Sequence, residues 1–269
     1  MKRSGVITYT LMVWAVSILG GCEKTPQGSV EQVVQAVGGR DRLVALHDVE
    51  YEYTYHKLGE DKKDVSLERY LLDGELSWAR YIVRENALPD MKGEMVQGYD
   101  GKESWCTLNS KLLDDHQALR MADFSRKTNF YWFTMMFKLL DPGINYEGLG
   151  KRTVDGVEYD VVKLTFGQNV GDAQDTYVLY INPETHLVDQ FLFTVMDFNM
   201  SEPLLMKVAY EDIAGLKLPT RRKYIKSNWD AQVKGETWTE EISSNVKFNN
   251  GFDVAMFEKP VAEMSAKAQ

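Results

Sequence analysis

The feature that most constrains the fold is a long series of short strand-like runs separated by turn residues. The first run, 49–56, alternates one valine and three tyrosines with polar residues, and this period of two is typical of a strand with one buried face. Further runs are predicted over 65–72, 75–84, 94–99, 104–108, 145–152, 159–166, 176–181, 187–198, 204–210, 217–226 and 238–248. Asp-Gly pairs at 73–74 and 100–101 are strong hairpin signals. The chain is therefore predicted to form antiparallel meanders.

Helical patterns precede and interrupt these runs. Valines at 30, 33, 34 and 37 predict a helix with one apolar face, with Ser29 and Gln32 as its capping box and Gly38-Gly39 at its end. A second short helix is predicted over 41–47, and a helical or loop segment over 111–140. In the run 187–198 both faces are largely apolar, so both sides of that strand must be covered. The predicted fold class is mainly β with helices (α+β), an antiparallel half-barrel wrapped around helices.

The amino terminus has the layout of a secretory signal peptide. Lys2 and Arg3 precede a mostly apolar stretch over 11–19, which is too short for a spanning helix of about 20 residues. The sequence Leu-Gly-Gly-Cys at 19–22 closely resembles the lipobox of bacterial lipoproteins, which implies acylation of Cys22 and cleavage before it. Glu23 follows the cysteine, and by resemblance to enterobacterial lipoproteins it favours the outer membrane.

These signals divide the chain into four predicted parts. Residues 1–21 are the signal peptide, 22–28 a lipidated tether, 29–260 a single half-barrel domain and 261–269 a C-terminal tail. Loss of residues 1–21 removes two basic residues and no acidic one, so the formal charge changes from −9 to −11. A chain this acidic has no electrostatic reason to bind nucleic acid. After lipidation Cys106 is the one thiol left, so no intramolecular disulfide and no cysteine zinc cluster is expected.

No catalytic arrangement stands out in the sequence. The four histidines lack metal-ligand spacing, and a G-x-S-x-G elbow is absent. Asp114 and Asp115 beside His116 are the nearest approach to an acid/base cluster, which we interpret as a solvated face or a helix cap. Cys106 lies in a strand-like run and is interpreted as a core residue. The sequence thus predicts no catalytic residue, metal or cofactor.

Two unusual segments have alternative interpretations. The run Arg221-Arg222-Lys223 is either an exposed strand end or a contact for a lipid phosphate or an acidic partner. The apolar run 130–140 is either a helix buried against the sheet or the lining of an apolar cavity, where methionine and aromatic side chains adapt to varied ligands. The candidate pocket residues in this run are Trp132, Phe133, Met135, Met136 and Phe137.

Three sequence motifs in the chain resemble those of a known superfamily. They are Gly-Tyr-Asp-Gly-Lys-x-x-Trp at 98–105, Tyr-Ile-Asn-Pro-x-Thr at 180–185 and Tyr-x-x-Ile-x-Gly-x-x-Leu-Pro at 210–219. With the order of elements, they look like the outer-membrane lipoprotein-sorting proteins, which include the LolA and LolB carriers. More narrowly, the sequence is similar to an uncharacterised family of bacterial lipoproteins. The resemblance implies an incomplete β-barrel whose concave face, closed by helices, shelters acyl chains.

The predicted function follows from the anchor and this resemblance. We expect a non-catalytic lipoprotein, held in the bacterial outer membrane and facing the periplasm, that binds a hydrophobic ligand such as an acyl chain or lipid. It would take part in the handling of envelope lipids or lipoproteins. The alternative is an interaction or sensor domain whose half-barrel is filled by its own side chains and whose partner is another envelope protein.

Overall fold

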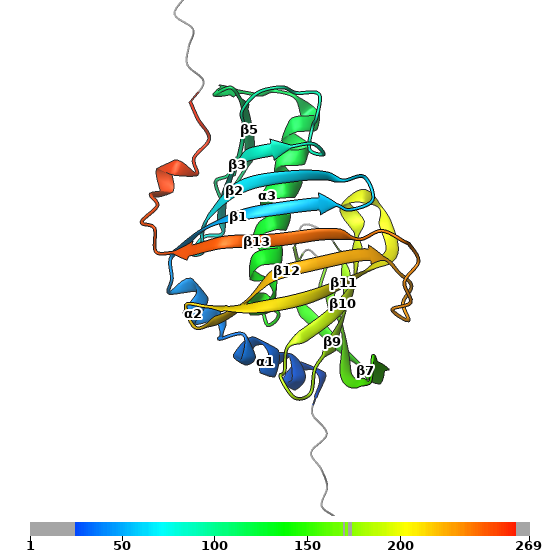
Figure 1. The fold of residues 1–269 in the computed structure, drawn as a ribbon. Helices are drawn as coiled ribbons and strands as arrows, with labels where there is room; N and C mark the ends of the chain where they lie inside the picture. The colour runs from blue at the N-terminus through cyan, green and yellow to red at the C-terminus, as the bar shows by residue number, and fades with distance from the viewer. Residues whose placement is uncertain (1–24, 169, 172–173, 262–269) are drawn as a thin grey trace, which may run out of the picture.

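The computed structural model describes residues 25–168, 170–171 and 174–261 (Figure 1). The lipidation predicted at Cys22 lies outside these residues. The helices are α1 (Pro26–Ala36), α2 (Arg40–Val44) and α3 (His116–Lys138), with short 3-10 turns η1 (Met196–Phe198) and η2 (Val254–Met256). The strands are β1 (Asp48–Lys57), β2 (Lys62–Leu71), β3 (Leu76–Arg84), β4 (Met95–Tyr99), β5 (Ser104–Leu108), β6 (Lys111–Leu112), β7 (Ile144–Val154), β8 (Val157–Phe166), β9 (Thr176–Ile181), β10 (Val188–Val195), β11 (Met200–Ile213), β12 (Leu216–Lys226) and β13 (Thr239–Phe248).

In the described residues the strands form one 13-stranded antiparallel sheet. Its order is β6-β5-β4-β3-β2-β1-β13-β12-β11-β10-β9-β8-β7. The last strand, β13, pairs with both β1 and β12 and so joins an amino-terminal meander to a carboxyl-terminal one. Every other neighbouring pair is consecutive in the chain, as expected for strands joined by short turns.

The long helix α3 packs inside the curve of this sheet. Figure 1 shows α3 crossing behind β1, β2, β12 and β13, with α1 and α2 near its carboxyl-terminal end. Asp115 caps the helix, because its carboxylate accepts a hydrogen bond of 2.8 Å from the amide of Ala118. The antiparallel half-barrel wrapped around a helix, with its α+β composition, confirms the predicted fold class.

The first helix begins earlier than the sequence predicts. It starts at Pro26, with Thr25 as its N-cap, because the Thr25 hydroxyl accepts a hydrogen bond from the Gly28 amide at 3.1 Å. Proline suits the first helical position, where no amide donor is needed. Ser29, the predicted cap, is instead a buried residue of the first turn. Residues 26–28, predicted as tether, are therefore helical.

Both faces of the carboxyl-terminal half of the sheet are covered, as predicted from the run 187–198. Phe191 and Phe193 of β10 belong to the large core cluster that contains α3. Leu192, between them, belongs to a second cluster on the opposite face. Ala231 and Trp238, from the connection between β12 and β13, pack against this second cluster. The helix lies inside the curve and the irregular connection lies outside it.

A buried ion pair fastens α3 to the amino-terminal meander. Arg126 of α3 and Glu68 of β2 are both 0% exposed, and their side chains form two hydrogen bonds of 2.5 and 3.1 Å. Glu68 also accepts hydrogen bonds from Ser66 at 2.7 Å and Tyr70 at 3.1 Å. This network fixes the position of Arg126, and with it α3, against β2.

Candidate functional site

A large cavity lies between α3 and the concave face of the sheet. Its volume is about 1180 Å³, and its lining comes from α3, from the strands β1–β4 and β7–β13, and from connections between them. Cavities that bind small ligands usually measure roughly 300–1,000 Å³. The space is therefore large enough for an extended apolar ligand.

One wall of the cavity is aromatic and aliphatic. Trp132 of α3 contacts Phe193 of β10 with ring centroids 5.1 Å apart, and Tyr177 of β9 lies 6.2 Å from the same indole. Phe166 and Leu204 extend this wall on either side. Flat and branched side chains of this kind offer apolar surface without a charge, which suits a hydrocarbon chain.

A second, polar part of the lining lies where β1, β12 and β13 pair. The hydroxyls of Tyr55 and Tyr224 are hydrogen bonded at 2.8 Å. Tyr53 and Glu241 line the same region and are only 7% and 4% exposed. Burial and then the Glu241 carboxylate raise the pKa of Tyr53 well above its ordinary value, so its hydroxyl stays protonated. We call Tyr53, Tyr55, Tyr224 and Glu241 the polar pole.

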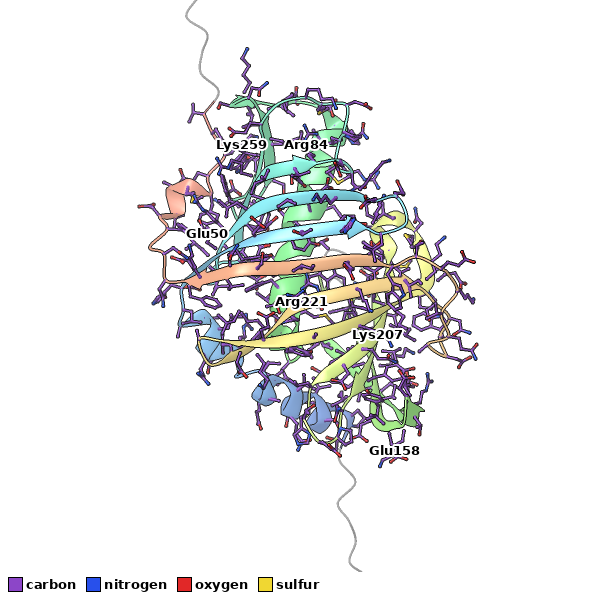
Figure 2. All side chains as sticks on the ribbon, viewed as in Figure 1. Glu50, Arg84, Glu158, Lys207, Arg221 and Lys259 are labelled. Atoms are coloured by element: carbon purple, nitrogen blue, oxygen red, sulfur yellow. The ribbon has the colours of Figure 1, made fainter. Side chains whose placement is uncertain are left out.

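The basic run at 221–223 is divided between the two faces of β12. Arg222 points inward, is 4% exposed, and donates hydrogen bonds to Glu241 at 3.0 Å and to the Trp132 carbonyl at 2.8 Å. Arg221 and Lys223 are exposed, and Figure 2 shows Arg221 on the outer face of the sheet. Arg222 is therefore neither an exposed strand end nor a free contact for a phosphate or an acidic partner. It links Glu241 of the polar pole to the backbone of α3.

One end of the cavity is lined by residues beside the strand ends that are drawn on the right in Figure 1. Antiparallel pairing brings the β1–β2, β10–β11 and β12–β13 connections to this edge, and Lys57, Lys226 and Thr237 beside them line the cavity. We call this edge the mouth. At the opposite edge, ion pairs of Lys138 with Glu75 and with Asp141 cross the lining.

The mouth carries two carboxylates and an apolar lip. Asp175 and Asp197 line the cavity and form no ion pair with any described residue. Burial raises the pKa of Asp175; hydrogen bonds from neighbouring groups oppose this and the nearby Asp197 adds to it. We define the apolar lip as Met196, Phe198 and Met200, which are 38%, 44% and 38% exposed. A ligand that enters here meets apolar side chains and negative charge together.

The comparisons with known proteins agree with this architecture. Residues 92–202 match a family of unknown function (DUF6503). A DUF1329 family protein from Desulfovibrio piger ATCC 29098 is 15% identical, over 87% of this chain and 97% of that chain, with a TM-score of 0.51. The LolA superfamily protein NE2245 from Nitrosomonas europaea is 14% identical, over 87% of this chain and 98% of that chain, with a TM-score of 0.52.

The chain has a LolA-like fold. The resemblance read from the three sequence motifs is therefore confirmed at the level of the fold. No curated protein matches the sequence. The LolA-like fold does not by itself determine a function, because one fold serves many functions.

The five predicted pocket residues do not share one environment. Trp132 lines the cavity, whereas Phe133, Met135, Met136 and Phe137 are 1–2% exposed, belong to the core cluster and are not part of the lining. Position along the helix explains the difference: Met135 and Met136 share a face with Trp132 but lie about one turn nearer the carboxyl-terminal end of α3, where the helix is packed in the core. Phe133, for example, stacks on Tyr51 of β1 with ring centroids 4.8 Å apart. In place of these four, α3 presents Phe124, Thr128, Asn129 and Tyr131 to the cavity.

The other residues singled out in the sequence have structural roles. Asp115 is the N-cap of α3, and His116 beside it is exposed. Cys106 is 0% exposed, and burial raises the pKa of its thiol to about 11. A thiol in this state is a poor nucleophile. Both interpretations, a helix cap and a core cysteine, are confirmed.

Sequence reasoning missed the polar pole and the network of Glu68. Val65 and Leu67 alternate with Ser66 and Glu68. From this pattern one expects Val65 and Leu67 to be buried and Ser66 and Glu68 to face solvent. In the structure, Ser66 pairs with Tyr53 and Glu68 pairs with Tyr51 across β1 and β2. The available signal was the row of tyrosines on β1, which needs polar partners for its hydroxyls.

The described part of the chain shows neither a metal-ligand cluster nor a membrane-spanning helix. No group of three or more histidine, cysteine, aspartate or glutamate side chains is placed to hold a metal ion there. Among the helices of the same residues, none combines the length and the apolar character needed to cross a bilayer.

Proposed function

We propose that this LolA-like protein binds a hydrophobic ligand, an acyl chain or a lipid, in the cavity between α3 and the concave face, without catalysis. The observation that carries the proposal is the cavity of about 1180 Å³ with its wall of Trp132, Tyr177 and Phe193. A wall of this kind gains roughly 25 cal/mol for each Å² of apolar surface removed from water. Ligand contact at this wall therefore has a driving force.

The rest of the proposal concerns location. Residues 1–21 act as the signal peptide, and the lipidated Cys22 holds the half-barrel domain, which begins with α1 at Pro26 and extends to residue 260, at the outer membrane, facing the periplasm. Residues 261–269 follow as a tail. Several acyl chains on one residue anchor durably, since each buried methylene contributes about 0.8 kcal/mol. A protein held in this way is suited to envelope lipid or lipoprotein handling.

The test is native mass spectrometry of the chain from Glu23 onward, which contains every element of the fold. After purification without detergent, organic extraction is expected to release a co-purified lipid or fatty acid. Thr128→Trp places an indole in the cavity, because Thr128 lines it, and should abolish the adduct. Gln117→Trp, on an exposed position of the same helix, is the matched control and should retain it. A ligand-free mass that persists after incubation with membrane lipids would refute the proposal.

A second candidate function is binding of an envelope protein. The apolar lip favours it, because large exposed apolar side chains that cluster on one connection often mark an interaction surface. A ligand-free protein that instead captures a partner, and loses it on Phe198→Ser, would support this candidate. Phe198 is half-buried against Phe124, with ring centroids 4.6 Å apart, so the thermal stability of the variant must be measured alongside.

A further inference from the structure

The polar pole contains two buried groups with unused hydrogen-bonding capacity. Tyr53 lines the cavity, and its hydroxyl has no hydrogen-bond partner among the described residues. Glu241 uses one carboxylate oxygen, Oε2, to accept from Arg222 at 3.0 Å, while Oε1 accepts from no described residue. Both side chains line the cavity, so the Tyr53 hydroxyl and Glu241 Oε1 are available to the polar group of a ligand there.

The chemistry of these groups restricts that partner. An ionised carboxylate only accepts hydrogen bonds, and a tyrosine hydroxyl both donates and accepts. A ligand that satisfies Glu241 must therefore bring a donor, N–H or O–H. A ligand carboxylate would instead face Glu241 without a free cation, because Arg222 is already paired with Glu241 and does not line the cavity.

The carboxylates at the mouth also disfavour a negatively charged ligand. Asp175 and Asp197 have no ion-pair partner among the described residues, and Asp64 of β2 is held by backbone amides rather than by a cation. Two lysines lie at this edge: Lys57 pairs with Glu60 at 3.8 Å, so Lys226 is the cation that faces the three carboxylates there. Carboxylates along an entrance favour cations and disfavour anions.

The aromatic wall begins directly beside the pole. Phe193 contacts Tyr224 with ring centroids 6.1 Å apart and contacts Trp132 on its other side. A ligand whose polar group lies at Tyr53 and Glu241 can therefore extend its chain along Phe193 and Trp132. The cavity as a whole is amphipathic, and it matches an amphiphile in which a donor group is joined to a hydrocarbon chain.

We propose that the cavity selects amphiphiles whose polar group donates hydrogen bonds and carries no negative charge, namely alkylammonium or hydroxyl-headed acyl compounds, and that Tyr53 and Glu241 recognise this group. This inference rests on the proposed function and adds the class of head group. It excludes free fatty acids as the preferred ligand.

The test compares three twelve-carbon amphiphiles that differ in the head group. Dodecylammonium, monododecanoylglycerol and dodecanoate, each below its micelle concentration, compete with a neutral fluorescent probe for the chain from Glu23 onward at pH 7.5. The first two are expected to bind at least about tenfold more tightly than dodecanoate, the effect of one well-formed hydrogen bond to a buried charge. Dodecanoate binding equally well or better would overturn the inference and leave the proposed function standing. Failure of all three to displace the probe would overturn both.

Two variants assign the preference to the pole. Tyr53→Phe removes only the unpaired hydroxyl and is expected to reduce the preference for the hydroxyl head by about tenfold. Its matched control, Tyr180→Phe, removes a buried hydroxyl on the opposite face of the sheet and should leave the preference unchanged. Glu241→Gln should remove most of the preference for dodecylammonium. If both pole variants melt like the unmodified protein and keep its ranking of the three ligands, Tyr53 and Glu241 do not recognise the head group.

Discussion

Replacement of Arg126 by methionine tests what holds the cavity open. Arg126 of α3 is 0% exposed and donates two hydrogen bonds to Glu68, which is equally buried. Burial alone would lower the pKa of Arg126, but the Glu68 carboxylate raises it overall, so the arginine is charged at every accessible pH. Arg126→Met keeps much of the side-chain volume and leaves Glu68 without its cation.

The cost can be worked out from the partners that remain. Loss of one partner of a buried ion pair usually costs about 3–5 kcal/mol. Glu68 keeps hydrogen bonds from Ser66 at 2.7 Å, Tyr70 at 3.1 Å and Asn129 at 3.3 Å, which places the expected loss near the lower end, about 3 kcal/mol. For a chain of this size that loss lowers the melting temperature by roughly 6–12 °C.

Urea unfolding followed by far-ultraviolet circular dichroism measures the effect. Adding Glu68→Gln to Arg126→Met removes the unpaired charge and should recover at least about 1 kcal/mol. Lys163→Met removes an exposed pair with Glu147, at 2.9 Å, and should change the stability by less than about 1 kcal/mol. A loss below about 1 kcal/mol for Arg126→Met, or a double variant no more stable than the single one, would refute the reasoning.

Three further predictions address the frame of the half-barrel. Gly98→Ala would place its methyl carbon 2.3 Å from ring atoms of Trp105, so we expect a loss of about 1–3 kcal/mol in urea and a shifted tryptophan fluorescence. Burial opposes ionisation of Asp48, but hydrogen bonds from residues 250–252 lower its pKa overall. The ionised carboxylate therefore stabilises the fold above pH 3.8, and this stabilisation is lost as the pH falls through the lowered pKa. Urea unfolding at a series of pH values should show a smaller loss in Asp48→Asn. Burial raises the pKa of Tyr81 from 10.0 to about 12, so its stabilisation is lost as the pH rises through that range, and tyrosinate absorbance should appear together with unfolding.

The strands were predictable because their signals are local. The β4–β5 hairpin follows from Asp100 and Gly101: the Asp100 carboxylate accepts from the amides of Lys102 and Glu103, and Gly101 has a φ of 91° that suits glycine. The start of α1 was harder to predict from the sequence, because Thr25 and Ser29 are both good N-cap residues. The fold decides between them, since it buries Ser29 in the core. Alternation and turn chemistry thus define the elements more reliably than their ends.

The candidate site was less predictable because it depends on which faces meet. The apolar run in α3 marks a buried helix, but it does not show how far along the helix the cavity extends, so that Trp132 borders the cavity while Met136, one turn later, lies in the core. The polar pole depends on strand order, since Tyr53 and Glu241 are nearly two hundred residues apart and meet only because β13 returns beside β1. Such long-range pairing leaves no trace in the neighbouring sequence.

The lining of the cavity distinguishes an open half-barrel from one filled by its own side chains. A half-barrel that collapsed onto apolar residues would bury the Tyr53 hydroxyl and the Oε1 atom of Glu241 without partners, and each unpaired group would cost about 1–3 kcal/mol. The four core residues of α3 show that this chain fills space with side chains where the facing surface is apolar, as at Tyr51 and Phe133. At the cavity, α3 presents the smaller Thr128 and Asn129 beside its aromatic residues, and space remains. That space has a polar part at Tyr53 and Glu241 and an aromatic wall at Phe193, the two kinds of surface that an amphipathic ligand would contact.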